Sequence, residues 1–134
     1  MLEDTTGISR GSPLLTEFDV FRDPTGAVRA RGRIELPDGT RLQLSLYRPG
    51  SNEFLARTQF AVRDRQFESV PLSGGEGGLP EALYRVELVT YFDSAWQPRE
   101  VMVATDNGRA VRGPGVVYGR NGIAAFIHTE DQRL

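Results

Sequence analysis

The residues of this chain that could do chemistry are few and lie far apart in the sequence. The only histidine is His128, and the chain has no cysteine and no Gly-x-Ser-x-Gly segment to supply an activated nucleophile. We expect His128 to be a solvated surface residue in a tail that frays. One histidine without cysteine also makes no tetrahedral zinc site. The sequence therefore predicts a protein that is not an enzyme, with no catalytic residue, no metal and no cofactor.

Carboxylates suggest two further sites, one for calcium and one for glycoside hydrolysis. Asp93 and the turn at residues 106–108 flank one expected strand pair, where hard oxygen ligands suit calcium. An ordinary turn explains Asp106-Asn107-Gly108 as well, and we favour it. Glu87 and Glu100 are candidate cross-strand neighbours for a hydrolytic acid pair, but each stands beside an arginine, which favours solvated ion pairs.

Two features remain as binding hypotheses, and the first is a row of arginines. Arg29, Arg31 and Arg33 alternate with small and apolar residues, so they share one face of an expected strand. A hairpin register would place Gln43, Ser45 and Tyr47 across from them. Such a face is either a solvated outer surface or a docking surface for a partner rich in carboxylates.

The second binding hypothesis rests on Trp96, the only tryptophan, which stands in an expected loop close to Tyr91, Phe92 and Pro98. An exposed aromatic ring at the end of a sandwich stacks on sugar rings or anchors a protein partner, whereas a buried one closes the end of the core. With the two chain ends added, the predicted partner-binding residues are Arg29, Arg31, Arg33, Tyr47, Trp96, Tyr118 and Phe126.

The elements that must position these residues are strands. From Ala27 to Arg48, apolar and polar residues alternate on both sides of Pro37-Asp38-Gly39, which predicts a hairpin. Leu83 to Phe92 is apolar on both faces and predicts a central strand. No segment shows the helical period. The remaining expected strands are Thr16–Phe21, Phe54–Val62, Gln66–Leu72 (with Pro71 indicating an edge), Arg99–Thr105, Val116–Tyr118 and Ile123–Ile127.

This pattern predicts an all-β antiparallel sandwich of about seven to nine strands. The segments Gly32-Arg33-Ile34, Leu36-Pro37-Asp38-Gly39-Thr40, Phe67-Glu68-Ser69 and Tyr84-Arg85-Val86-Glu87 resemble the immunoglobulin-like modules of the prealbumin-like and carboxypeptidase-regulatory-like kind. The resemblance covers about residues 27 to 105. It implies a module that mostly serves as an appended binding or structural domain.

The domain organisation follows from the same pattern. We expect an N-terminal arm at residues 1–15, a sandwich at 16–106 that looks complete by Thr105, and a Gly-rich extension at 107–134 with a possible hairpin. Because the extension carries Val116, Val117, Ile123 and Ile127, it either folds back over the sandwich or adds a strand to a neighbour. Residues 74–78 are expected to be a flexible loop tip and not a phosphate-binding loop.

The composition of the chain limits the classes of partner that we expect. The 134 residues contain 16 basic residues, all of them arginine, and the net charge is -2, which argues against nucleic-acid binding. The acidic start at Glu3 and Asp4 does not resemble a signal peptide, so the protein is either cytoplasmic or lacks its leader here. No stretch has the length of a membrane span.

The function expected is a structural or interaction subunit of a larger protein assembly; the alternative is a carbohydrate-binding module that uses Trp96.

Overall fold

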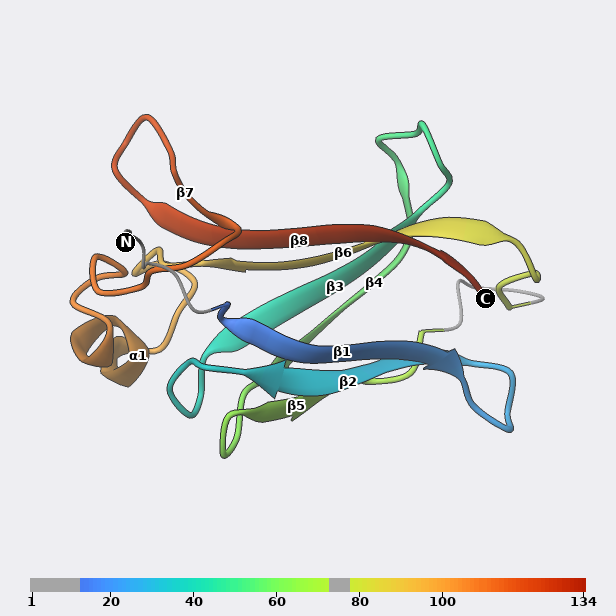
Figure 1. Cartoon of the computed structure of the whole chain (residues 1–134), viewed down its shortest axis with the longest axis horizontal. Coiled ribbons are helices and arrows are strands. Elements are labelled where there is room, and N and C mark those ends of the chain that lie inside the picture. Colours follow the sequence, from blue (N-terminus) through green and yellow to red (C-terminus); the bar gives the residue numbers. More distant parts are fainter. Residues whose placement is uncertain (1–12, 73–77) are drawn as a thin grey trace, which may run out of the picture.

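Two antiparallel sheets form the fold (Figure 1), seen in a computed structural model that describes residues 13–72 and 78–134. The first has three strands in the order β1-β2-β5, and the second has five in the order β4-β3-β6-β8-β7. The predicted all-β sandwich class is thereby confirmed. The strands are β1 (Leu15–Arg22), β2 (Val28–Ile34), β3 (Arg41–Tyr47), β4 (Phe54–Ala61), β5 (Gln66–Glu68), β6 (Leu83–Tyr91), β7 (Val116–Tyr118) and β8 (Ala124–Arg133).

The predicted hairpin at residues 27–48 is wrong, although both of its strands exist. β2 belongs to the three-stranded sheet and β3 to the five-stranded sheet, so residues 35–40 cross from one layer to the other. The apolar side chains of the two strands, such as Val28 on β2 and Leu44 on β3, are fully buried. Alternation correctly identifies the buried residues but does not specify whether the next strand lies beside its neighbour or across the core.

A second crossing, from β4 to β5, lies against the first. The Val62 amide donates to the Thr40 carbonyl at 2.9 Å, and the Gly39 amide donates to the Val62 carbonyl at 2.8 Å. The Asp38 carboxylate accepts the amide of Asp64 at 2.7 Å, where the chain has positive φ. These bonds satisfy main-chain groups that two separate loops would leave to solvent.

The C-terminal segment is an integral part of the second sheet. β8 pairs with β6 over nine residues, from Ala125 opposite Tyr91 to Arg133 opposite Leu83, and β7 pairs with the first residues of β8. The expectation that the sandwich is complete by Thr105 is wrong, and of the two alternatives for the tail the structure has the one in which it folds back. The hairpin expected around Gly119-Arg120-Asn121-Gly122 is confirmed.

The strand expected at Arg99–Thr105 is a short helix, α1 (Arg99–Ala104), which also corrects the expectation that the chain has no helix. Val101 and Val103 alternate as in a strand, but Val103 is 72% exposed, and the buried residues are Val101, Met102 and Thr105. That spacing is helical. Six residues are too few for the helical period to be recognised from sequence.

No helix of the described residues is long and apolar enough to cross a membrane. The central position predicted for Leu83–Phe92 is confirmed, because β6 is the third of five strands. Pro71 follows β5, which is an edge strand as predicted. The predicted arm lies mostly outside the described residues, as does the loop tip at 74–78 apart from its last residue.

Gly32 in β2 marks a close approach that permits no side chain. A Cβ at this position would lie 2.1 Å from the main-chain oxygen of Glu17 and 2.6 Å from the ring of Phe67. We therefore expect Gly32→Ala to lower the free energy of unfolding by about 1–3 kcal/mol, the usual cost of overpacking, in urea or thermal denaturation.

Gly119→Ala is the matched control for this variant. Gly119 also lies outside the positive-φ region, and the nearest atom to its added Cβ is the Asn121 side-chain oxygen at 3.2 Å. Its stability should change by less than about 0.5 kcal/mol, as for ordinary surface substitutions. Equal effects of the two substitutions would contradict the close approach at Gly32.

Candidate functional site

The outer face of the five-stranded sheet carries two clusters in which arginine and aromatic side chains pack together. The residues of β3 and β6 that point away from the core are not fully solvated, because Ser45, Tyr47 and Val89 are buried beneath longer neighbours. Two clusters cover this face. We call them the Arg–Tyr cluster (Tyr47, Phe54, Arg57, Arg85 and Glu87) and the Trp96 cluster (Arg41, Tyr91 and Trp96).

Arginine guanidinium groups lie on aromatic rings throughout the Arg–Tyr cluster. The Arg57 guanidinium carbon lies 3.9 Å from the ring centre of Phe54, and that of Arg85 lies 4.4 Å from the ring centre of Tyr47. Arg57 also donates from Nε to Ser45 Oγ at 2.9 Å and from Nη2 to the Tyr47 hydroxyl at 3.3 Å. Each cation–π contact is worth about 0.5–1 kcal/mol at an exposed site, so these side chains are held in place before any ligand arrives.

The Trp96 cluster is positioned by the buried side-chain amide of Gln97. Gln97 Oε1 accepts the amide of Arg41 at 2.9 Å, while Gln97 Nε2 donates to the Arg41 carbonyl at 3.1 Å and to the Thr90 hydroxyl at 2.7 Å. These bonds tie the loop after β6 to the start of β3. Trp96 therefore rests edge-on against Tyr91 at 5.7 Å between ring centres, with the Arg41 guanidinium 5.8 Å from its ring centre.

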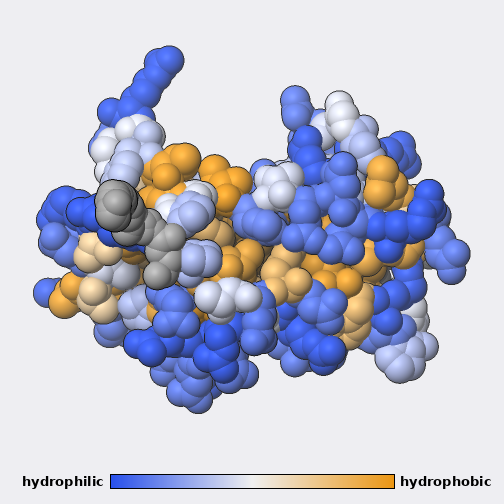
Figure 2. All heavy atoms as spheres, viewed as in Figure 1, coloured by the Kyte–Doolittle hydropathy of each residue, from blue (hydrophilic) through white to orange (hydrophobic). Residues whose placement is uncertain are grey.

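Exposed apolar side chains accompany the two clusters on the same face. Tyr91, Val117 and Ile127 extend the Trp96 cluster across β6, β7 and β8, because residues paired across neighbouring strands share a face. The exposed fractions of these side chains and of Phe54 run from 37% for Ile127 to 50% for Phe54. Hydrophobic residues are visible over β7 in Figure 2.

The predicted row of arginines lies on the outer face of the three-stranded sheet and not beside Gln43, Ser45 and Tyr47, so that register is wrong. Its neighbours are acidic. Arg31 lies 3.5 Å from Asp19, and Arg29 lies 3.4 Å from Asp23 and 3.0 Å from Glu68. This arrangement supports the interpretation as a solvated outer face.

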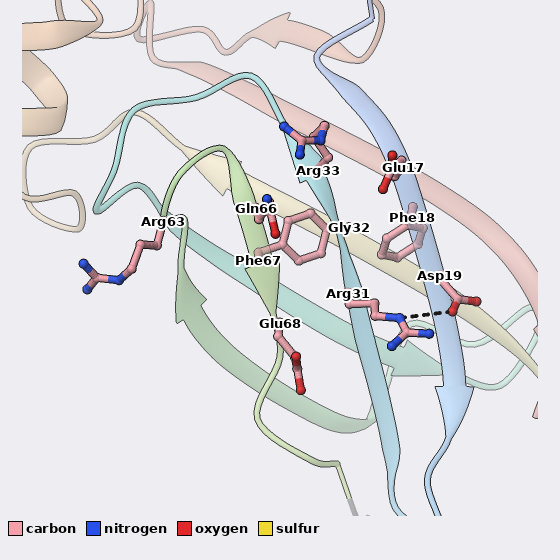
Figure 3. Close-up of a pocket in the computed structure, with 10 residues that line it drawn as sticks. All are labelled: Glu17, Phe18, Asp19, Arg31, Gly32, Arg33, Arg63, Gln66, Phe67 and Glu68. Carbon is pink, nitrogen blue, oxygen red and sulfur yellow. Dashed lines mark ion pairs between the residues drawn. The ribbon is translucent and has the colours of Figure 1, made fainter.

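An open depression of about 740 Å³ lies over this sheet (Figure 3). Gly32 lies between the rings of Phe18 and Phe67 at its centre, as the figure shows. Three arginines and three carboxylates line it, so their formal charges cancel, and no net potential attracts a charged ligand. The charged residues are Glu17, Asp19, Arg31, Arg33, Arg63 and Glu68.

The structure separates the other predicted residues. Phe126 is 3% exposed within the core, so it is a packing residue, whereas Tyr118 is exposed on β7 and its hydroxyl accepts a hydrogen bond from Arg112 at 3.1 Å. His128 is half-buried on β8 and faces β1: its Nε2 lies 2.7 Å from Glu130 Oε1, and its ring meets Phe18 at right angles. The expectation of a solvated histidine in a frayed tail is therefore wrong.

The acidic candidates form local contacts. Asp93 accepts the amide of Ala95, and Asp106 pairs with Arg109 at 2.9 Å. Within the two described segments, no three histidine or carboxylate side chains come together in a way that could hold a metal ion.

Comparison of the chain with protein-family models, curated proteins and solved structures found no match in any of the three. The site must therefore be interpreted from its own geometry. Sequence reasoning identified Tyr47 and Trp96 but missed Arg57 and Arg85, whose alternation with apolar residues is that of any solvated strand face. Gln97 was also missed, because a buried glutamine in a loop has no signal in a single sequence.

Gln97 provides a test of how Trp96 is positioned. We expect Gln97→Leu to lower the free energy of unfolding by about 1–3 kcal/mol, because the Arg41 amide loses its partner. Tryptophan fluorescence should shift to longer wavelength as the loop loosens and Trp96 gains solvent. Gln43→Leu on the same sheet is the control, and an unchanged Trp96 emission in Gln97→Leu would contradict the proposed anchoring.

The stability of the fold should depend on pH through Asp23, which lies in the turn between β1 and β2. A hydrogen bond from the Thr25 hydroxyl, helped by the amides of Thr25 and Ala27 and by the charge of Arg29, holds the pKa of Asp23 below its ordinary value. A lowered pKa in the folded state stabilises the protein above the ordinary pKa, and this contribution is lost as the pH falls through the folded-state pKa.

Asp23→Ala should therefore lower the unfolding temperature at neutral pH by an amount that shrinks in acid. Scanning calorimetry of both proteins over a pH series measures this difference. Asp23→Asn keeps an acceptor oxygen without the charge, so its deficit at neutral pH should be smaller. If the difference in unfolding temperature between Asp23→Ala and the unchanged protein were the same at every pH of the series, the ionised carboxylate would have no role.

Proposed function

We propose that this domain is a non-enzymatic interaction or structural subunit that binds a protein partner through the outer face of its five-stranded sheet. One observation carries the proposal: tyrosine, tryptophan and arginine side chains are stacked on one another across this face. These three residue types dominate the energetics of protein interfaces.

Order in the unbound domain strengthens this argument. Arg57 and Arg85 are long side chains that would lose much rotamer freedom on binding if they were mobile. Here their guanidinium groups already lie on Phe54 and Tyr47, and Arg85 donates to the Ser51 carbonyl at 3.1 Å. Less conformational entropy is therefore lost when a partner docks.

The charge of the clusters indicates the chemistry of the partner. The Arg–Tyr and Trp96 clusters together contain three arginines and one glutamate, Glu87, which accepts a hydrogen bond from Tyr47 at 3.3 Å. A complementary surface offers carboxylates opposite the arginines and apolar side chains opposite Val117 and Ile127. The C-terminal strands thus contribute to the proposed interface through Val117 of β7 and Ile127 of β8.

The resemblance to immunoglobulin-like modules of the prealbumin-like and carboxypeptidase-regulatory-like kind belongs to the same proposal. Modules of that kind mostly serve as appended binding or structural domains. Two stacked antiparallel sheets are compatible with that type. Its motifs at residues 32–40 and 84–87 lie at the end of β2, in the first crossing and in β6.

Capture experiments test this function. The immobilised domain should retain a protein partner from an extract of its source, and Tyr91→Ala combined with Trp96→Ala should reduce that capture at least about tenfold, as loss of two interface anchors does. Because neither side chain is in the buried core, circular dichroism of the variant should be unchanged.

Arg31→Ala on the opposite sheet is the matched control and should capture the partner normally. A partner lost with Arg31→Ala and kept by the double variant would contradict the proposal. An oligosaccharide array covers the alternative function: sugar binding that disappears in Trp96→Ala would replace the protein-binding function with a carbohydrate-binding one. A sugar stacking on the side of the Trp96 ring that Arg41 covers would displace the guanidinium.

A further inference from the structure

The outer edge of β4 is a row of main-chain groups that pair with no strand of the described residues. β4 pairs with β3 on one side, with Leu42 opposite Phe60, Leu44 opposite Thr58 and Leu46 opposite Ala56. Hydrogen bonds of an antiparallel ladder alternate, and the next bond along this ladder joins Val62 to Thr40, so the even-numbered residues of β4 bond to β3.

The odd-numbered residues consequently direct their main-chain groups away from β3. By this alternation the amide and carbonyl groups of Arg57, Gln59 and Ala61 point away from β3, whereas Leu55 lies at a register shift between the pairs Leu46–Ala56 and Tyr47–Phe54. β4 is the first strand in the order β4-β3-β6-β8-β7, so this row faces outward from the sheet. Three residues supply six main-chain hydrogen-bonding groups, which is a template for an added strand.

We propose that two copies of this chain associate through β4, pairing antiparallel about Thr58 so that the two five-stranded sheets become one continuous sheet. This inference concerns an edge that the proposed partner-binding function does not use. It stands on the register of β4 and not on that function.

The side chains of β4 fit this pairing. With Thr58 opposite its own copy, Arg57 lies opposite Gln59 of the second copy, and Leu55 lies opposite Ala61. Arg57 and Gln59 then form two hydrogen-bonded pairs across the two-fold axis, and no like charges face each other. A register centred on Arg57 would set the two arginines directly opposite, which is destabilising.

The orientation of Arg57 removes the charge that normally protects an edge strand. A charged side chain at a sheet edge blocks added strands when it stays solvated beside the main chain. The Arg57 guanidinium instead turns toward β3, where it lies on Phe54 and bonds Ser45 and Tyr47. It is the one charged residue of the eight in β4.

The other edges fit a second copy less well. β5 and β7 have three residues each, and β1 carries three charged residues, Glu17, Asp19 and Arg22. Among the described residues β8 has no partner on its outer side beyond Ile127. Registers centred on Glu130 or Asp131 set like charges opposite each other, and one centred on Gln132, which pairs Asp131 with Arg133, uses only the last residues of the strand.

Such a dimer would double the proposed binding face. A two-fold axis perpendicular to the joined sheet keeps both outer faces on one side, so the two Arg–Tyr clusters meet across the new strand pair. The contact consists mainly of one strand pair, and we therefore expect a weak, reversible dimer with a dissociation constant on the order of 0.1–1 mM.

Sedimentation equilibrium and hydrogen exchange of the complete chain test the dimer. Over a concentration series up to about 1 mM, the mean mass should rise toward twice that of the chain. In the same series, amide exchange should slow at Arg57 and Gln59, whose amides point away from β3 in the single copy. A monomer throughout, or exchange at these two amides that does not depend on concentration, would overturn the proposal.

Substitutions at Gln59 test the register. Gln59→Arg sets like charges opposite each other twice and should weaken the dimer about tenfold, whereas Gln59→Glu sets opposite charges and should not weaken it. Gln43→Arg and Gln43→Glu are the matched controls, because Gln43 lies next to Gln59 on β3, one strand in from the edge. This pairing would be excluded if Gln59→Arg and Gln59→Glu changed the dissociation constant of the dimer equally. It would also be excluded if the substitutions at Gln43 changed it as much as those at Gln59.

Discussion

The structure depends on the stacking of two consecutive apolar strands across the core. Val28, Ala30 and Ile34 of β2 and Leu42, Leu44 and Leu46 of β3 are fully buried, and they can face one another only if the chain changes sheets between them. The crossing at Glu35–Thr40 makes this change, and it is held by hydrogen bonds to the second crossing after β4. Because the chain changes sheets there, β3 and β6 pair and their outward residues form the proposed binding face.

The sequence predicted most strands and the buried residues on them, because a two-residue period reports burial directly. It did not predict the partner of each strand. The same alternation at residues 27–48 is compatible with a hairpin and with a crossing between sheets, and Pro37-Asp38-Gly39 suits both. The position of β8 was missed for a related reason: glycines at 108, 113, 115, 119 and 122 resemble a linker, whereas in the fold they surround β7 and the turn before β8.

The candidate site was predictable in part. Tyr47 and Trp96 are rare large residues on an otherwise polar pattern, which made them visible in the sequence. Arg57 and Arg85 were missed, because a guanidinium that lies on a ring has the same sequence signal as one in solvent. The row formed by Arg29, Arg31 and Arg33 was recognised from its regular spacing. Its acidic partners could not be recognised in the same way, because Asp19, Asp23 and Glu68 lie on other segments of the chain.

The two faces of the sandwich use arginine in different ways, and this difference decides which of them suits a partner. On the three-stranded sheet the arginines are already paired with carboxylates, and the Arg31–Asp19 pair is exposed to screening by solvent and salt. A partner would have to compete with these carboxylates. On the five-stranded sheet the arginines lie against aromatic rings, which leaves part of each guanidinium able to bind a carboxylate while its apolar surface is already covered. A docking carboxylate therefore gains a charge-assisted hydrogen bond there without breaking an ion pair between described residues.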